Sequence, residues 1–175
     1  MRSKARSIGR CCRKPGFTLI DTALATIIVG VGVMAVMQLL ATGTTNNYDG
    51  AQQTTAANLA KNIREMCLNL DFVDPNNPNN WGQNASQYSS NPATIVGLNN
   101  LAGVTFCPPV DSRKVAIAGW TDWQQAVNVQ TVNPNLLTAS APNGSEPAVQ
   151  ITVTVSHLGQ PFYTMSWYAF DGAPP

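Results

Sequence analysis

The feature that most constrains this chain is a long uncharged stretch near its start. No charged side chain occurs from Thr22 to Asn47, and the part from Leu24 to Ala41 consists mainly of Ile, Val, Leu, Met and Ala. A helix of about 20 such residues is long enough to cross the hydrocarbon core of a bilayer. The stretch therefore predicts one membrane-spanning helix.

A short basic segment precedes the apolar stretch. Six of the ten basic residues lie before Gly16, and no acidic residue accompanies them: Arg2, Lys4, Arg6, Arg10, Arg13 and Lys14. Basic residues beside a membrane span favour the cytoplasmic side. Without this segment, four basic residues remain against nine acidic ones, a side-chain charge of −5. A domain of that sign has no electrostatic reason to bind nucleic acid, so we expect no nucleic-acid partner.

An ordinary secretory signal peptide is the main alternative interpretation of the apolar stretch. Such a signal has an apolar core of about 7–15 residues, followed by small residues at a cleavage site. Ala41-Thr42-Gly43 could serve as that site. Two observations weigh against it, because Asp21 interrupts the start of the apolar core and the helical pattern continues beyond Gly43.

The helical pattern becomes one-sided in its second half. Apolar residues recur within about 120° of one another on a helical wheel at 100° per residue, at Ala56, Leu59, Ala60, Ile63, Met66, Cys67 and Leu70. Polar and charged residues occupy the opposite side. We therefore expect one helix from about Thr18 to Leu70, near 80 Å long at about 1.5 Å per residue.

The cysteines agree with an exported domain. Cys11 and Cys12 lie in the basic segment, which leaves Cys67 and Cys107 as an even pair. In an oxidising compartment we expect a disulfide between these two, and the alternative is two buried free thiols. Because Cys67 lies on the apolar face of the helix, its partner would lie on the sheet that covers that face.

The later part of the chain is predicted to form mainly strands. Asp74 to Asn80 ends the long helix, and the Asn-rich segment through Pro92 is predicted as a surface loop. Strands are predicted at 104–107, 114–118 and 149–156, the last continuing through a turn into a hairpin with 161–170. A short helix is predicted over 120–127, with Thr121 as a candidate N-cap. This order favours an α+β fold, a long N-terminal helix packed on a small antiparallel sheet.

Residues suited to catalysis or metal binding are scarce. His157, the single histidine, is predicted at a hairpin end in solvent. Asp71 and Asp74 could flank a calcium ion, but helix termination explains them more simply. With two cysteines beyond the basic segment and no clustered carboxylates, metal ligands are lacking. We expect no enzyme, no cofactor and no metal, and core or sheet-covering roles for Trp120, Trp123 and Trp167.

The junction between the basic segment and the apolar helix resembles the processing site of type IV prepilins and of the pseudopilins of type II secretion. The residues that carry the resemblance are Lys14-Pro15-Gly16-Phe17-Thr18-Leu19-Ile20-Asp21. The segment from Ala57 to Met66 is similar to the helix end of PilV-type minor pilins. The resemblance is strong over about residues 14–68 and less specific in the later half.

This resemblance implies cleavage by prepilin peptidase after Gly16 and N-methylation of the new terminal residue, Phe17. It also implies that Asp21, where the family normally has glutamate, pairs with the methylated amine of a neighbouring subunit. The alternative role for Asp21 is an acid that extends to the inner membrane face. The implied organisation is a cleaved leader (1–16), a transmembrane and filament-core helix (17–43), an amphipathic half (44–72) and an α+β head (73–175).

The implied function is a structural subunit, a minor pilin, of a type IV pilus. Its partners would be prepilin peptidase, other pilin subunits, the inner-membrane assembly platform and lipid. The precursor would lie in the inner membrane with a cytoplasmic N-terminus and a periplasmic head, and the mature subunit would lie in a pilus at the cell surface. Two alternatives are a minor pseudopilin in a periplasmic pseudopilus, and a tethered or secreted binding domain that never polymerises.

Overall fold

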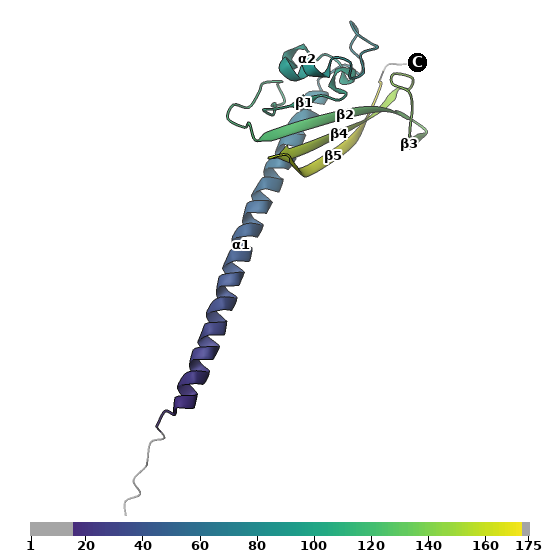
Figure 1. Ribbon diagram of the computed structural model, residues 1–175. Helices are drawn as coiled ribbons and strands as arrows, with labels where there is room; N and C mark the ends of the chain where they lie inside the picture. The colour runs from purple at the N-terminus through teal and green to yellow at the C-terminus, as the bar shows by residue number, and fades with distance from the viewer. Residues whose placement is uncertain (1–15, 173–175) are drawn as a thin grey trace, which may run out of the picture. The chain divides into compact units, whose positions relative to one another are not determined.

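The computed structural model describes residues 16–172. The basic segment before Gly16, with Cys11 and Cys12, lies outside the described residues. The elements, labelled in Figure 1, are α1 (Leu19–Cys67), α2 (Ala85–Ser90), the short 3-10 helices η1 (Pro92–Thr94) and η2 (Leu98–Leu101), β1 (Thr105–Phe106), β2 (Trp123–Asn133), β3 (Leu136–Ser140), β4 (Ala148–His157) and β5 (Gln160–Phe170). The chain divides into two compact units, Met1–Asn47 and Tyr48–Pro175.

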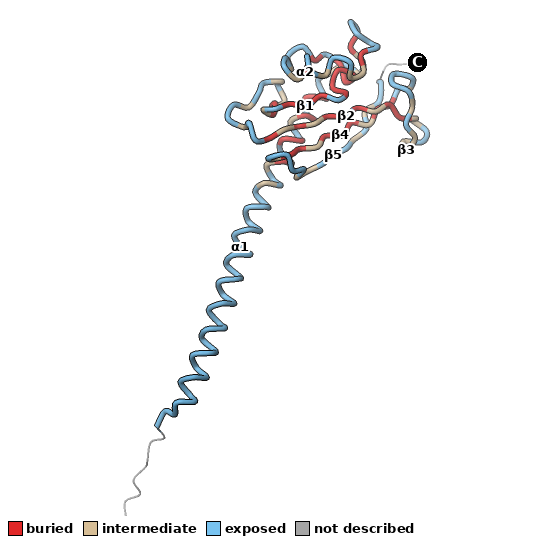
Figure 2. Tube along the Cα trace, in the orientation of Figure 1, coloured by how far each residue is buried: buried red, intermediate tan, exposed pale blue. Residues whose placement is uncertain are grey.

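The first unit contains the apolar part of α1. Its side chains are exposed throughout residues 19–47, which Figure 2 draws in pale blue. The few hydroxyl groups in this segment bond back to the helix, since Thr26 Oγ1 donates to the carbonyl of Thr22 at 2.7 Å and Thr42 Oγ1 to that of Gln38 at 2.9 Å. The polar atoms of these side chains are therefore satisfied without solvent.

The second unit contains the end of α1 packed on the sheet. Its buried helix residues are Ala56, Leu59, Ala60, Ile63, Met66 and Cys67, and Leu70 packs partly buried against the same core. These seven are the apolar face expected from the sequence, so that prediction is confirmed. The helix ends at Cys67, before the Asn-rich segment, rather than at Leu70.

The sheet is antiparallel, with strand order β1-β2-β4-β5 and β3 paired to the far end of β2. The three long strands lie side by side in Figure 1. Inward positions alternate along them, as in the row formed by Val127, Val153 and Met165, so every second side chain faces the core. The predicted strands at 104–107 and 149–156 and the final hairpin are confirmed, and so is the α+β arrangement of a long N-terminal helix on an antiparallel sheet.

Two predicted elements are wrong. Residues 120–127 do not form a helix, because β2 begins at Trp123 and its buried residues alternate with a period of two. Pairing on both sides, Ala126 with Thr105 and with Thr154, makes the strand the better conformation for this segment. Residues 114–118 do not form a strand, since they contain a single bridge from Ala116 to Val110 and a left-handed Lys114 (φ 67°).

The Asn-rich segment is more than a surface loop, which corrects a third expectation. It contains α2, and Asp74, Asn80 and Tyr88 in it are buried. The residues just before it run beside residues 96–98, where the Asp71 N–H donates to the Val96 carbonyl at 3.1 Å. Gly97 is required at this contact, because a Cβ there would lie 2.2 Å from the backbone nitrogen of Asp74.

Candidate functional site

The first candidate site is the start of α1. Gly16 and Phe17 precede the helix, and the Phe17 side chain is 83% exposed. A Cβ placed on Gly16 would meet no atom within 4 Å, so packing within the described residues does not require glycine here. The backbone around this junction is accessible, which a peptidase needs at a scissile bond.

Asp21 and Thr18 form a reciprocal cap at the first turn of α1. The Thr18 N–H and Oγ1–H donate to Asp21 Oδ2 at 3.1 and 2.7 Å, and the Asp21 N–H lies 3.4 Å from Thr18 Oγ1. This is the arrangement of a capping box, in which two unpaired backbone donors at a helix start are satisfied. Sequence reasoning missed this role, although a threonine followed three residues later by an acid is the signal for it.

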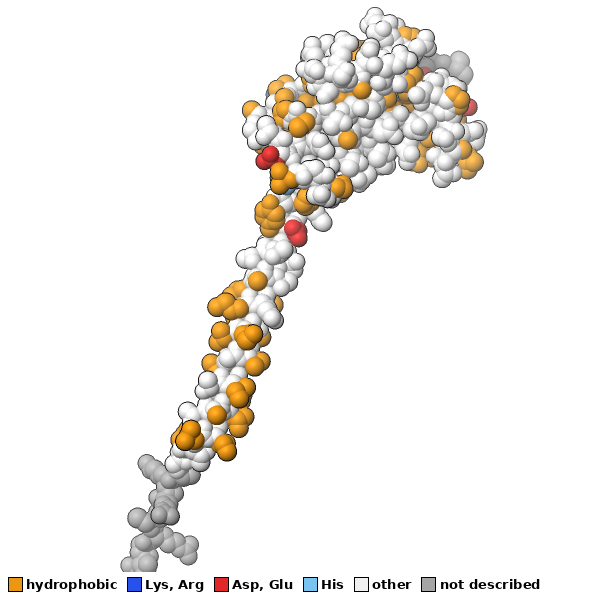
Figure 3. Space-filling model, viewed as in Figure 1, with side chains coloured by type: hydrophobic (Ala, Val, Ile, Leu, Met, Phe, Trp, Pro, Cys, Tyr) orange, Lys and Arg blue, Asp and Glu red, His pale blue; other side chains and the backbone are white. Residues whose placement is uncertain are grey.

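The second candidate site is the apolar surface that follows. Thirteen large hydrophobic side chains between Leu19 and Leu40 are each 51–91% exposed. Figure 3 shows hydrophobic side chains along this part of α1. Gly32 leaves a hollow of about 320 Å³ among Val29, Val33, Val36, Met37 and Leu40. Among residues 16–172 the structure has one helix that is long and apolar enough to cross a membrane, and this helix is α1.

The two cysteines expected to pair are free thiols in the structure. Cys67 is buried at the end of α1, and burial raises the pKa of its thiol to about 12. Cys107 is exposed, and its Sγ–H points to the Thr121 carbonyl at 3.5 Å. Successive side chains of a strand point to opposite faces, and Phe106 takes the inward position beside it. The structure therefore does not contain the predicted disulfide.

The aromatic residues cluster where β4 turns into β5. His157 is the last residue of β4 and stacks on Trp123 with ring centroids 4.4 Å apart, and Phe162 contacts both rings. His157 is therefore part of a packed aromatic group, not a freely solvated turn residue as expected. Trp123 is buried, and Trp120 and Trp167 pack partly buried against the core, which confirms their predicted roles.

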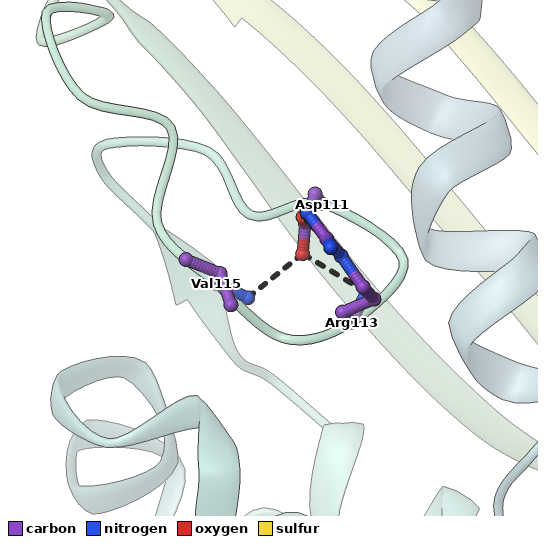
Figure 4. Close-up of polar contacts among 3 residues, drawn as sticks. All are labelled: Asp111, Arg113 and Val115. Atoms are coloured by element: carbon purple, nitrogen blue, oxygen red, sulfur yellow. Dashed lines mark hydrogen bonds and ion pairs between the residues drawn. The ribbon is translucent and has the colours of Figure 1, made fainter.

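A compact polar turn lies between β1 and β2 (Figure 4). Asp111 accepts hydrogen bonds from the Val115 N–H at 2.9 Å and the Arg113 N–H at 2.9 Å, and it forms an ion pair with the Arg113 guanidinium at 3.1 Å. The backbone bond from Val115 lowers the pKa of Asp111, and the bonds and charge of Arg113 add to this against an opposing effect of burial. These contacts shape the turn.

Within residues 16–172, no group of three or more His, Cys, Asp and Glu side chains could hold a metal ion. Burial raises the pKa of Asp74, but hydrogen bonds from Asn76, Asn77 and Asn100 outweigh it and keep that pKa below its usual value. The Asp74 carboxylate therefore already accepts hydrogen bonds from its own chain.

Comparison with known proteins identifies no relative. The chain matches no family model, no curated protein and no solved structure. Any function must therefore be argued from the chain itself.

Proposed function

We propose that this protein is a structural subunit, of the minor pilin kind, of a type IV pilus. The observation that carries the proposal is the uncovered apolar segment of α1, which starts three residues after Gly16 and precedes a folded C-terminal unit. Burying one large apolar side chain is worth about 1.5–3 kcal/mol, so this segment is strongly driven out of water. Lipid would cover it in the precursor, and the helices of neighbouring subunits would cover it in a filament.

Asp21 supports the same proposal. An acid at the centre of a membrane helix costs about 2.5–3.5 kcal/mol, and acids within membrane segments usually have a partner. Its own-chain partner is Thr18, which leaves the carboxylate still charged. After cleavage at Gly16, the new amine of Phe17 would lie four residues before the acid. In an assembled filament, the methylated amine of an adjacent copy would neutralise Asp21.

The proposal implies a cytoplasmic leader, a single span of the inner membrane and a C-terminal unit outside the cytoplasm. Prepilin peptidase, other subunits and the inner-membrane assembly platform would be its partners. A pseudopilin of type II secretion would have the same processing site at Gly16 and Phe17, the same acid at Asp21 and the same apolar helix. Partner capture from cells carrying each apparatus separates the two.

The mature N-terminus tests the proposal. Mass spectrometry of the protein from its native membrane should show a chain that starts at methylated Phe17. A chain that starts near Thr44 would show secretion by an ordinary signal peptidase, and a chain that keeps Met1 would show a plain anchor. Either of these two results would contradict the proposal that the protein is a filament subunit.

A matched pair of variants sharpens this test. Gly16→Val should block processing, because the added side chain obstructs the peptidase at the scissile bond. Gly43→Val makes the same change at the alternative cleavage site, and a Cβ there also meets no atom within 4 Å. We expect Gly43→Val to be shortened normally, whereas the opposite pattern would identify a secretory signal.

A further inference from the structure

The Asn-rich segment is held in shape by amide groups that are completely buried. The Asn99 side chain accepts from the Asp74 N–H at 2.8 Å and donates to the carbonyls of Asn77 and Asn80 at 3.0 and 3.1 Å. Asn99 is 0% exposed. Burying polar groups is costly unless each is paired, so a network of this kind rigidifies the segment that it joins. Here it fixes the backbone of residues 74–80.

A second buried amide supports the same segment from another direction. Asn100 accepts from the N–H groups of Val96 and Gly97, each at 3.0 Å, and its Nδ2 donates to the Tyr88 hydroxyl at 2.9 Å. The Asn80 Nδ2 donates to the same hydroxyl at 3.0 Å. Asn99, Asn100 and Tyr88, which hold the loop, are thus distinct from the exposed amides of Asn76, Asn79, Gln83 and Asn84 that it presents.

This supported loop lines an open surface cavity of about 280 Å³. Its lining carries no charge and consists of Asn76, Asn77, Pro78, Asn79, Asn80, Gln83 and Asn84. Within the described part of the chain, the side-chain amides of Asn76, Asn79, Gln83 and Asn84 make no hydrogen bond. A volume of about 300 Å³ is at the lower end for small-ligand sites.

One buried atom of the lining also lacks a partner. The Asn80 side-chain oxygen makes no hydrogen bond within residues 16–172, although Asn80 is only 5% exposed. A buried polar atom without a partner is uncommon in folded proteins and calls for an explanation. Because this oxygen has almost no accessible surface, a ligand in the cavity would bind through the exposed amides of the lining and not through this atom.

We propose that this cavity binds a neutral sugar. A primary amide offers two donors and an acceptor in one plane, and neighbouring sugar hydroxyls offer the complementary donors and acceptors. An anion would find no cation in the lining, and a divalent cation would find no carboxylate there, since hard cations take charged oxygens first. The cavity lies in the C-terminal unit, so this inference is independent of the proposed filament role.

Sugar titration of the full-length chain tests the proposal. The protein is kept in a detergent without a sugar headgroup and titrated with glucose, galactose and N-acetylglucosamine at millimolar concentrations. Trp81 is a built-in reporter, because its Nε1–H donates to the carbonyl of Pro78 in the lining at 3.2 Å. Saturation-transfer NMR provides a second readout on the sugar itself. We expect at least one of these sugars to bind.

Single substitutions locate the binding. Asn76→Ala and Asn79→Ala should each weaken it about five- to tenfold, the loss of roughly one hydrogen bond. Their side chains hold nothing in place, so their unfolding midpoints should stay at the wild-type value. Asn128→Ala makes the same change on an exposed residue of β2 and should leave binding unchanged.

Three results would overturn the proposal. These are the absence of binding of all three sugars, equal binding by the Asn79→Ala and Asn128→Ala variants, and a cation as the true occupant. Asn79→Asp identifies the last case, since an added carboxylate would strengthen Ca²⁺ binding. Measurable Ca²⁺ binding by the wild-type chain, enhanced in that variant, would replace the sugar with a metal.

Discussion

Replacement of Gln125 by alanine tests how the sheet is joined to the helix. Gln125 lies in β2 and is 0% exposed. Its Oε1 accepts from the Val110 N–H at 2.8 Å, and its Nε2 donates to the Leu59 carbonyl at 2.8 Å and to the Val110 carbonyl at 3.2 Å. One side chain thus links β2, α1 and the segment that follows β1.

The expected cost follows from these contacts. In the Gln125→Ala variant the buried Val110 N–H has no acceptor, which costs about 1–3 kcal/mol. The removed side-chain atoms leave a cavity, and burial of their apolar part is lost as well. We therefore expect the free energy of unfolding to fall by about 3–4 kcal/mol in total.

Urea unfolding of the full-length chain in detergent, followed by tryptophan fluorescence, measures this loss. With a slope of about 1–3 kcal/mol per molar urea, the midpoint should fall by more than about 1 M. Gln124→Ala is the control, because Gln124 is the half-exposed neighbour whose side chain makes no hydrogen bond within residues 16–172. Its cost should stay within about 0.5 kcal/mol. Equal midpoints for the two variants would refute the linking role of Gln125.

Three further predictions concern thiol reactivity and the pH dependence of stability. In reduced protein with serine at Cys11 and Cys12, Cys107 should react with an aromatic disulfide reagent at pH 8, and Cys67 should react only on unfolding. A chain isolated without reductant that shows no reactive thiol even when unfolded would instead contain the disulfide. Because folding raises the pKa of Cys67 from 9.0 to about 12, its contribution to stability should be lost as the pH rises from about 9 towards 12, which urea midpoints can follow. Asp111→Ala should cost about 1–2 kcal/mol at pH 7, where the carboxylate holds its turn. Because the folded-state pKa of Asp111 lies below 3.8, the stability difference between wild type and Asp111→Ala should be present above about pH 4 and disappear as the pH falls through the folded-state pKa. A stability difference that persists at low pH would contradict this role of the carboxylate.

The long helix could be predicted because its information is local. The apolar run and the one-sided pattern from Ala56 to Leu70 each repeat at the helical period, and no distant residue is needed to interpret them. The strand at Val149–Ser156 is similarly clear, since alternation with a period of two marks a half-buried strand. These two patterns determine the α+β class.

The errors arise where distant partners decide the conformation. Trp120, Trp123 and Val127 have a spacing that fits a helix, but β1 and β4 pair with both sides of this segment and make it a strand. The Asn-rich segment has the composition of a surface loop. Its burial depends on Asn99, whose side chain bonds to the Asp74 N–H 25 positions away.

The candidate sites also include some residues that local spacing reveals and others whose placement depends on distant partners. Gly16, Phe17 and Asp21 are recognisable from their spacing, and the structure adds the bonds between Thr18 and Asp21. The pairing of Cys67 with Cys107 was inferred from their number and compartment. The outward direction of Cys107 depends on the register of β1, which no local pattern reveals.

The sequence alone determined that this chain carries a basic N-terminal segment, an apolar helix and a one-sided continuation of that helix, because charge and periodicity act between near neighbours. The tertiary structure alone decided the strand at Trp123–Asn133, the outward Cys107 and the amide-lined cavity. Each of these depends on hydrogen bonds or packing between segments far apart in the chain, and the free energy of such contacts is defined only after the backbone has brought them together.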